Sequence, residues 1–456
     1  PIESLHILFV LFIYSFVYQF QKSARKEGRS HSPHTRSNVF IHFNDQIIIR
    51  KIDNVAIKIS ESLLLQHNRR RWNEATVRRE QARRPQLVSN SKKTTSIITD
   101  FILNTGCNYS LIMDGIFIED EPRFKHRGLL LDTSRHFFSV PEILQVLDGM
   151  SFPYQSVVYP QLSLKGAYHP ELAVYSLSDI ENVIDYARDR GIRVIPEFDT
   201  PGHTLSWGAS VKGLLAQCNT TGEYGPVDPS EPNNYVFLQR LLIEVASVFK
   251  DKYIHLGGDE VEIKCWEDNP KIASFMNKYN MSRNFTELET YYFTRLLNIT
   301  NLLNLKPVVW QEVFDFGVDL DPKTIIHVWK SEPEAMSPIV SRGYEALFSS
   351  CWYLDHLSET WRSYYHCDIL DFDATPEERA LVIGGEACMW GEWVDETNVS
   401  PRIWPRACAP AERLWSYGSR FPHSDTAARL EEHACRLKRR GIPTAPPNGP
   451  GYCPLL

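Results

Sequence analysis

Two adjacent acidic residues, Asp259 and Glu260, stand at the end of an apolar run and directly after two glycines. The run, residues 253–256, is typical of a buried parallel strand, which predicts that the acids lie at its carboxyl-terminal tip. Neighbouring side chains on a strand face opposite ways, so the acids can share a pocket only if Gly257 and Gly258 let the backbone bend. Two carboxylates held close together differ in pKa, which leaves one proton donor and one anion. A helix N-cap explains an Asp at this place equally well.

Strand and helix patterns alternate along the chain from about residue 112, as in a parallel barrel or a doubly wound sheet. Nearly every strand ends in an acid, Trp, Tyr or His, which favours an active site at the carboxyl-terminal face of a (β/α)8 barrel. Helices are predicted over 141–150 and 177–190, the second capped by Ser178. Seven strands are predicted: 128–132, 192–198, 253–256, 307–310, 324–329, 345–349 and 381–387. A closed barrel of this kind needs eight, and only residues 155–159 could supply the other.

The composition of the 456 residues favours a globular protein with a sizeable core in an oxidising compartment. Hydrophobic residues make up 43% of the chain, which is ample for a large core, and the net charge is −7. Nine cysteines without any C-x-x-C pair indicate neither a zinc ribbon nor a thioredoxin-type site. Together with several N-glycosylation sequons they favour an oxidising, glycosylating compartment. The sequons begin at Asn108, Asn219, Asn280, Asn284, Asn298 and Asn398.

The first 111 residues differ in character from the remainder. Residues 1–20 contain an apolar stretch, followed by basic residues, of about the length of a signal peptide or anchor, and no stable membrane span is expected. Residues 21–111 form a basic region with one plausible strand segment, 46–59. The arginines of 69–84 permit a polyanion-binding arm. A solvated charged segment is preferred, because a single aromatic residue, Trp72, lies among them and no nucleic-acid module can be recognised. No nucleic-acid partner is therefore expected.

Four segments give a specific resemblance. Residues 127–136 (RGLLLDTSRH), 196–203 (PEFDTPGH), 255–260 (HLGGDE) and 384–392 (GGEACMWGE) look like those of the lysosomal-type β-N-acetylhexosaminidases of glycoside hydrolase family 20, in the same order. The resemblance covers residues 112–456 and implies a catalytic (β/α)8 barrel that follows a small α/β domain. It also implies an exo-acting enzyme on glycans with terminal β-linked GlcNAc or GalNAc, without a metal or other cofactor. Members are commonly dimeric, so a homodimer is expected.

The family mechanism assigns different tasks to the two acids. The 2-acetamido oxygen of the substrate attacks the anomeric carbon, in place of a protein nucleophile. By the resemblance Glu260 is the general acid and then the base, while Asp259 orients the acetamido N–H and stabilises the intermediate. The neighbouring anion is expected to raise the pKa of Glu260.

The resemblance also assigns the surroundings of the acids. It implies aromatic walls for the N-acetyl pocket from Trp310, Trp329 and Trp390, although core packing is the alternative for each. It implies a hydrogen bond from Tyr353 to the acetamido carbonyl and a supporting pair, Asp199 and His203. Ligands of the sugar hydroxyls are implied at Arg127, Asp355 and Glu392, with a surface salt bridge as the alternative for Arg127. At His356, where the variant that accepts acidic sugars has Arg, the weaker charge of a His predicts a preference for neutral sugars.

Three disulfides are expected. The resemblance implies the pairs Cys218–Cys265 and Cys435–Cys453, and the spacing of Cys351 and Cys367 around one predicted loop suggests a third. The family's location implies the lysosome or secretion through the secretory pathway.

Two departures from the family pattern matter. Family members carry the second barrel strand, with polar residues at its tip, where Met150 here runs directly into Ser151. Such a gap exposes strand edges, so an inactive or destabilised splice form, or a sugar-binding relic, is the alternative function. Residues 23–93 also fail to match the family's small domain. A metal-dependent hydrolase that uses His136, His203 and His255 is a third reading, disfavoured because these residues lie on separate strands without a paired carboxylate.

Overall fold

The computed structural model describes residues 121–147, 155–416 and 423–453, together with three short strands within the first 57 residues. It divides into two compact units, residues 1–13 with 124–456, and residues 14–123. The described strands of the second unit are β2 (Arg50–Ile52) and β3 (Val55–Ile57), an antiparallel pair inside the predicted strand segment 46–59. Residues 58–120 lie outside the described residues, and with them the basic residues of 69–84 and the sequon at Asn108.

The first unit is built on an eight-stranded sheet with the order β5-β1-β4-β12-β11-β10-β9-β8. The run from β4 to β8 in this order is parallel throughout, which confirms the predicted α/β class. The two ends of the order approach each other, because an isolated parallel bridge joins Glu197, just after β5, to His255 of β8. The seven predicted strands correspond to β4 (His126–Leu131), β5 (Arg193–Val194), β8 (Tyr253–His255), β9 (Lys306–Trp310), β10 (Ile325–Val328), β11 (Glu345–Phe348) and β12 (Val382–Met389).

The place between β4 and β5 is where the resemblance predicts that a strand is missing. Strand β1 (Leu8–Val10) lies there and pairs antiparallel with both neighbours. The prediction that residues 155–159 could supply a strand is wrong: they form a loop whose Ser156 hydroxyl and following backbone N–H groups donate to Glu244. The prediction of a signal or anchor over residues 1–20 stays a prediction. In the part of the chain that the structure describes, no helix is long and apolar enough to cross a membrane.

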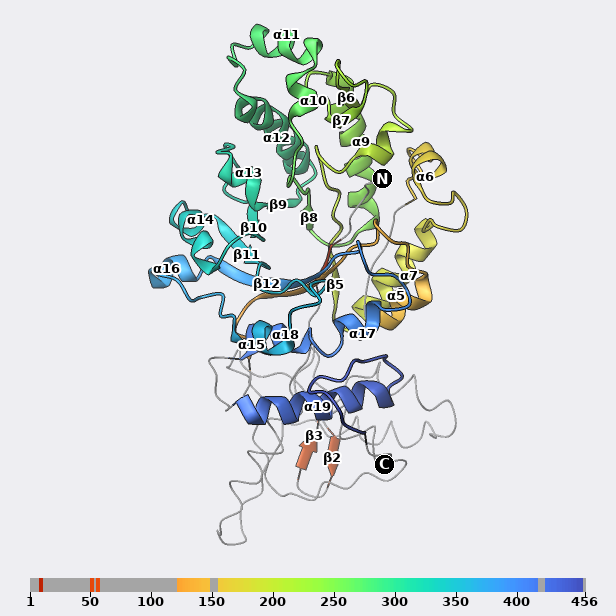
Figure 1. Cartoon of the computed structure of the whole chain (residues 1–456), viewed down its shortest axis with the longest axis vertical. Coiled ribbons are helices and arrows are strands. Elements are labelled where there is room, and N and C mark those ends of the chain that lie inside the picture. The colour runs from red at the N-terminus through yellow and green to blue at the C-terminus, as the bar shows by residue number, and fades with distance from the viewer. Residues whose placement is uncertain are drawn as a thin grey trace, which may run out of the picture. The chain divides into compact units, whose positions relative to one another are not determined.

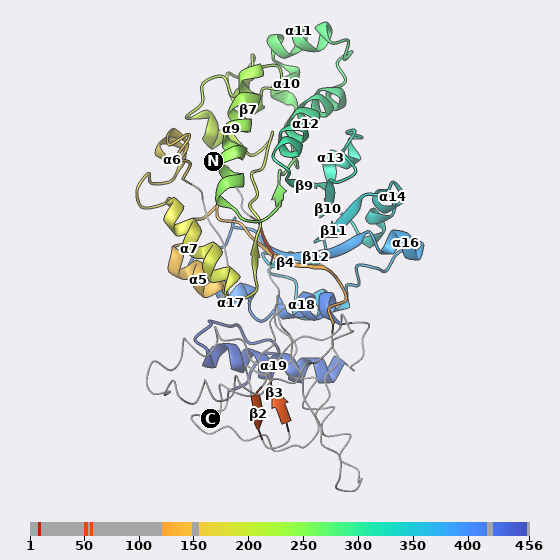
Figure 2. The same cartoon turned by 180° about the vertical axis from the view of Figure 1, so that it is seen from behind.

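Helices surround the parallel strands in both views of the fold (Figures 1 and 2). The predicted helix over 177–190 is confirmed as α7, but its cap is Ser176 rather than Ser178, since Ser176 and Asp179 form a capping box. The principal helices are α5 (Val140–Leu147), α7 (Leu177–Arg188), α9 (Pro232–Val248), α12 (Phe285–Leu302), α18 (Cys408–Trp415) and α19 (His423–Arg439). Shorter helices are α6 (Gln161–Gly166), α8 (Leu205–Gly208), α10 (Lys264–Glu267), α11 (Pro270–Lys278), α13 (Gln311–Asp315), α14 (Ser337–Ser341), α15 (Trp361–His366), α16 (Pro376–Arg379) and α17 (Val399–Ile403).

Apolar side chains fill both the layer between strands and helices and part of the space that the strands enclose. The large cluster runs from Leu129 of β4 through the helices to Leu437 of α19. Smaller clusters on the inner side of the strands centre on Trp310 and on Val308. Polar groups share that inner space, because His126 pairs there with Glu386, both buried. The layer between strands and helices is thus apolar, whereas the space inside the strands also holds hydrogen-bonded polar groups.

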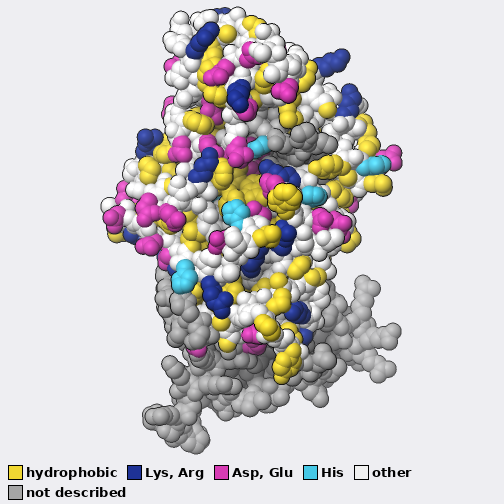
Figure 3. All heavy atoms as spheres, viewed as in Figure 1, with side chains coloured by type: hydrophobic (Ala, Val, Ile, Leu, Met, Phe, Trp, Pro, Cys, Tyr) yellow, Lys and Arg dark blue, Asp and Glu magenta, His cyan; other side chains and the backbone are white. Residues whose placement is uncertain are grey.

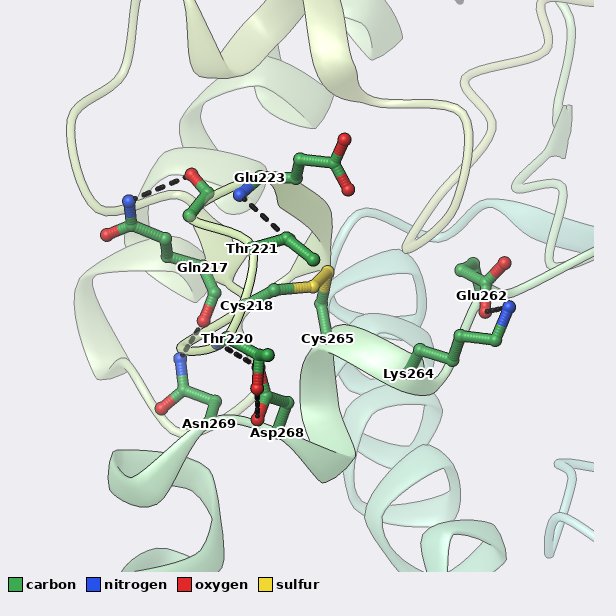
Figure 4. The surroundings of a disulfide bond; sticks show 11 residues. Gln217, Cys218, Thr220, Thr221, Glu223, Glu262, Lys264, Cys265, Asp268 and Asn269 are labelled. Atoms are coloured by element: carbon green, nitrogen blue, oxygen red, sulfur yellow. Dashed lines mark hydrogen bonds and ion pairs between the residues drawn. A yellow bond between two sulfur atoms is a disulfide. The ribbon is translucent and has the colours of Figure 1, made fainter.

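Three disulfides tie loops to this framework, and all three expected pairs form. Cys218 and Cys265 join the hairpin of β6 (Leu215–Gln217) and β7 (Tyr224–Val227) to α10. Figure 4 shows the same contact reinforced by Asn269, whose amide donates to the Gln217 carbonyl. Cys351–Cys367 spans the loop after β11, and Cys435–Cys453 fastens the final segment to α19. Of the cysteines that the structure describes, Cys388 and Cys408 are free thiols and buried.

The pairing of β12 with β4 depends on Gly384. This residue has φ +148°, and a Cβ there would lie 1.7 Å from the His126 carbonyl oxygen of the neighbouring strand. We predict that Gly384→Ala lowers the free energy of unfolding by about 3 kcal/mol or more, since it adds backbone overlap to an unfavourable φ. Gly213→Ala is the control: φ is +77° but the space is open, so the loss should be about 1 kcal/mol. Equal losses in chemical denaturation would contradict the predicted overlap.

Candidate active site

A pocket of about 630 Å³ lies at the carboxyl-terminal ends of the parallel strands. Figure 3 shows a recess on this face in which apolar side chains gather between acidic, basic and histidine side chains. Its lining combines carboxylates with aromatic rings, the composition of a site for a small polar ligand with flat apolar faces. The lining residues are Arg135, Asp259, Glu260, Trp310, Trp329, Tyr353, Asp355, His356, Leu357, Ser358, Trp390, Glu392 and Trp393.

The bend that brings Asp259 and Glu260 to one pocket is present. Gly257 and Gly258 have φ of +70° and +102°, and Glu260 itself has φ +51°. Gly257 also permits a close approach, because a Cβ there would lie 1.6 Å from the Asp199 carboxylate. Gly258 donates its backbone N–H to the same carboxylate at 2.9 Å. Positive φ at three of four consecutive residues turns both carboxylates inward, as the sequence predicts.

His203 connects the carboxylates behind the pocket. Its Nδ1 lies 2.5 Å from Asp199 Oδ2 and 3.9 Å from Asp259 Oδ1, and its Nε2 lies 3.5 Å from Glu260 Oε2. Burial alone would lower the pKa of His203, but the charge and hydrogen bond of Asp199, helped by Glu260 and Asp259, raise it to about 12. The ring is therefore a fixed imidazolium among three acids.

The two acids differ in pKa in the opposite sense to the prediction. The hydrogen bond from His203 holds the pKa of Glu260 below its usual value, against the smaller effect of partial burial. Burial raises the pKa of Asp259 well above its ordinary value, with Asp199 adding repulsion and His203 opposing. The expectation of a raised pKa for Glu260 is wrong for the unliganded site because Glu260 is half exposed and Asp259 is the buried member of the pair.

Four aromatic rings form one wall. The Trp310 and Trp390 ring centroids are 6.0 Å apart, and Tyr353 lies 6.3 Å from both Trp329 and Trp390. Each of two indoles is held by a buried carboxylate behind it: Trp310 Nε1 donates to Glu197 at 2.8 Å, and Trp329 Nε1 donates to Glu312 at 2.7 Å. All four predicted aromatic residues are brought to the pocket, whereas their two supporting acids were not predicted.

The arginine of the pocket is Arg135, not Arg127. Arg127, at the amino-terminal end of β4, is 4% exposed; it donates to the Phe124 carbonyl and lies over the Trp415 ring. Arg135 follows the tip of the same strand and lines the pocket, with Nε 2.9 Å from Glu392 Oε1. The assignment of Arg127 to a sugar hydroxyl stays a prediction, while Arg135 is the arginine that lines the pocket. The rule that ligand-binding residues follow the carboxyl-terminal ends of strands would have selected Arg135.

The loop after β11 carries Tyr353, Asp355 and His356 to the pocket. It is fastened to β12, because Leu354 donates its N–H to the Cys388 carbonyl and Cys388 donates to Trp352. Burial raises the pKa of Tyr353 well above its ordinary value, so the phenol remains a hydrogen-bond donor. His356 lies at the rim, 60% exposed. Leu357, Ser358 and Trp393, which the sequence analysis missed, complete the rim.

Two buried acceptors in the pocket have no hydrogen-bond partner among the described residues: Asp259 Oδ1 and Asp355 Oδ1. Buried polar atoms are nearly always paired in folded proteins, so unpaired oxygens in a pocket point to a ligand with N–H or O–H groups. Burial also raises the pKa of Asp355, against hydrogen bonds that would lower it.

The residues of the metal-hydrolase reading do not come together. His136 Nδ1 lies 2.5 Å from the Gly391 carbonyl, while His255 lies beneath the pocket, 3.2 Å from Glu197. Across residues 121–147, 155–416 and 423–453, one group has the spacing of a metal site: Asp199, His203 and Asp259. Their proximity has an explanation within the protein, because His203 Nδ1 lies 2.5 Å from Asp199 Oδ2 and 3.9 Å from Asp259 Oδ1.

The described sequons lie mostly on the surface. Asn219, Asn280, Asn284 and Asn298 are exposed, while Asn398 is half-buried and its amide donates to the Trp393 carbonyl. Glycosylation at all six sequons stays a prediction.

The comparisons with known proteins agree with one another. Residues 124–417 match the family model described as "Glycosyl hydrolase family 20, catalytic domain". The chain is 48% identical over 360 residues to the human "Beta-hexosaminidase subunit beta", covering 74% of this chain and 64% of that one. It is 47% identical to the bovine "Beta-hexosaminidase subunit alpha", covering 74% and 69%. The chain thus spans slightly less than two thirds of the human relative.

Solved structures show the same fold. The chitobiase of Flavobacterium johnsoniae superposes with a TM-score of 0.65 at 30% identity, covering 71% of this chain and 53% of that one. An exo β-N-acetylglucosaminidase from Vibrio harveyi gives a TM-score of 0.66 at 24% identity, covering 73% and 60%. At that identity the second likeness supports the fold alone.

The charge arrangement around His203 leads to a prediction. Replacing Asp199 by Asn removes the strongest influence that raises the pKa of His203, so this pKa should fall from about 12 toward the ordinary value of 6.5. The measurement is a pH titration of the His203 ring by NMR of 15N-labelled protein. Asp185→Asn, at an exposed ion pair with Arg188, is the control and should leave the His203 titration unchanged. An unaltered titration in Asp199→Asn would show that the carboxylate does not charge the ring.

Proposed function

The chain belongs to glycosyl hydrolase family 20, and from this membership we propose that it is an exo-acting β-N-acetylhexosaminidase. Its substrates are glycoconjugates or chitin oligomers with a terminal, non-reducing GlcNAc or GalNAc. The observation that carries the proposal is the buried Asp259 Oδ1 at a strand tip, next to Glu260 and among the aromatic residues of the wall, where it has no hydrogen-bond partner among the described residues. A neutral acetamido sugar has the groups that such a pocket matches: an N–H donor and a flat apolar face.

The proposed mechanism needs no nucleophile from the protein. Tyr353 and the aromatic wall hold the acetamido group so that its carbonyl oxygen attacks the anomeric carbon, a step favoured by proximity. Asp259 accepts the acetamido N–H, which directs the oxygen toward the anomeric carbon. The positive charge that develops on the cyclic intermediate lowers the raised pKa of Asp259, and the resulting carboxylate stabilises that charge. Asp355, Glu392 and Arg135 bind the hydroxyls of the terminal sugar.

Glu260 transfers the proton in this scheme. It protonates the glycosidic oxygen as the bond breaks and then removes a proton from the water that opens the intermediate. Its lowered pKa in the unliganded site favours activity at acidic pH, because the acid form is lost as pH rises through that pKa. A bound sugar excludes water from Glu260 and so raises its pKa within the complex. The imidazolium of His203 holds Glu260 and Asp259 in place.

We also propose a homodimer that resides in the lysosome or is secreted. The relatives are named as subunits, and the pocket rim exposes Leu357 and Trp393, a surface that a second copy could cover. Three disulfides suit an oxidising compartment. The runner-up, a destabilised or inactive form, is favoured by one observation: the place of a parallel strand is taken by the antiparallel β1.

The proposed function is tested with an aryl β-N-acetylglucosaminide. We expect hydrolysis at acidic pH, and a fall in kcat of about 10³-fold or more in Glu260→Gln, which cannot donate a proton. Thermal unfolding of the two proteins should coincide because Glu260 is half exposed. Hydrolysis that persists in Glu260→Gln would disprove its role, and a folded but inactive parent would support the relic instead.

The two arginines of the β4 segment give a matched pair. Arg135→Lys removes directional donors from the pocket, and we expect kcat/KM to fall by about 10- to 100-fold with little change in melting temperature. Arg127→Lys removes a buried contact outside the pocket and should instead lower the melting temperature, with kcat/KM within about twofold of the parent. The reverse pattern would favour Arg127 as the sugar ligand.

A further inference from the structure

One buried acid beside the pocket has no task in the mechanism above. Glu312 is 5% exposed and lies on α13, directly after the strand β9 that ends in Trp310. Its carboxylate reaches across to the tip of the next strand, β10. There Oε2 accepts from Trp329 Nε1 at 2.7 Å, and Oε1 lies 2.5 Å from Lys330 Nζ.

The neighbouring side chain acts on the same tip. Gln311 accepts the backbone N–H of Lys330 on its Oε1 at 3.2 Å. Two consecutive residues of α13 therefore hold three groups of one strand tip: an indole N–H, an ammonium and a backbone N–H. Hydrogen bonds to a carboxylate are short and directional, so they fix the rotation of the Trp329 ring as well as its position.

Glu312 affects the pocket through both Trp329 and Lys330. Trp329 lines the pocket and stacks with Tyr353 at 6.3 Å and 24°. The Lys330 ammonium lies 4.5 Å from the Trp329 ring centroid, and its charge contributes to the lowered pKa of Glu260. A free Lys330 side chain, 44% exposed, would otherwise move through many rotamers.

We propose that Glu312 is a positioning residue that sets the Trp329 wall and the Lys330 charge for sugar hydrolysis, an inference that rests on the proposed function. It parallels Glu197, which holds Trp310 from the neighbouring position at 2.8 Å. Glu312 differs from Glu197 in that it fixes a cation as well as a ring, so its removal should alter both sugar binding and the proton chemistry.

A second acid nearby supplies a matched control. Glu289 of α12 is 3% exposed and carries a carboxyl oxygen without a hydrogen-bond partner among the described residues. Burial, with repulsion from Glu312, raises the pKa of Glu289 to about 8. At acidic pH it is therefore an uncharged acid, and it is not one of the residues that line the pocket. A Gln there retains its shape and neutrality. The other charges that act around Glu312 are Lys330, Asp315 and Asp259.

The test compares Glu312→Gln with Glu289→Gln on an aryl β-N-acetylglucosaminide. Glu312→Gln keeps an oxygen for the indole but loses the charge that holds Lys330. We expect kcat/KM to fall by about 10-fold or more through misplacement of the wall. The descending limb of its pH profile should move to higher pH, because the displaced ammonium no longer lowers the pKa of Glu260. Glu289→Gln should stay within about twofold, with the parent's pH profile.

A double-mutant comparison separates positioning from general destabilisation. Trp329→Phe removes the indole N–H, so Glu312→Gln should cost less in that background than in the parent. If Glu312→Gln does not fold, Glu312→Asp, which draws the charge back by one methylene, takes its place. Equal costs in both backgrounds, or a Glu312 variant that matches Glu289→Gln, would overturn the inference while hydrolysis by the parent upholds the function. An inactive parent would overturn both.

Discussion

The structure depends most on keeping several carboxylates buried beside one another at the tip of β8. Asp199 and Asp259 are almost fully buried, and unpaired charges in such a place cost several kcal/mol each. The imidazolium of His203 offsets this cost because it lies within 4 Å of both. The local backbone follows from the same requirement, since only glycine at 257 lets the Asp199 carboxylate approach the bend. Site and fold are thus parts of one electrostatic arrangement.

A second polar arrangement supports the pocket floor from inside the strands. Trp310 donates to Glu197, His255 Nδ1 lies 3.2 Å from the same carboxylate, and His255 Nε2 lies 3.3 Å from His327. On its other side His327 Nε2 lies 2.6 Å from the Ser349 hydroxyl oxygen. Burial, with repulsion from the neighbouring rings, lowers the pKa of His327 well below its ordinary value, so this ring is neutral. A neutral His327 ring can link strands β10 and β11 to His255 of β8 without adding its own charge beneath the acids.

The features that could be predicted from the sequence are those that depend on residues close together in the chain. The strand tips, the glycine bend and the aromatic wall are recorded in short motifs, and the parallel α/β class follows from alternation. Prediction failed where partners come from distant segments. The pKa of Glu260 depends on its exposure and on His203, and the supporting acids Glu197 and Glu312 are visible only once β8, β9 and β10 lie side by side. Arg135 was not predicted because motif matching did not consider which residue follows the carboxyl-terminal end of β4.

A strand missing after Met150, as the resemblance predicts, would affect these two polar arrangements to different degrees. The strands β4, β12, β11, β10, β9 and β8 form an unbroken parallel run, and their tips carry Glu260, the four aromatic residues and Arg135. Asp199 and His203 follow β5, beyond the antiparallel β1, and reach the acids through the bridge between Glu197 and His255. Loosening at β1 would therefore weaken the charge balance of Asp259 and the restraint on Glu260 before it disturbed the aromatic wall. On the proposed function, a missing strand at this place would affect catalysis mainly through the imidazolium of His203, which follows β5.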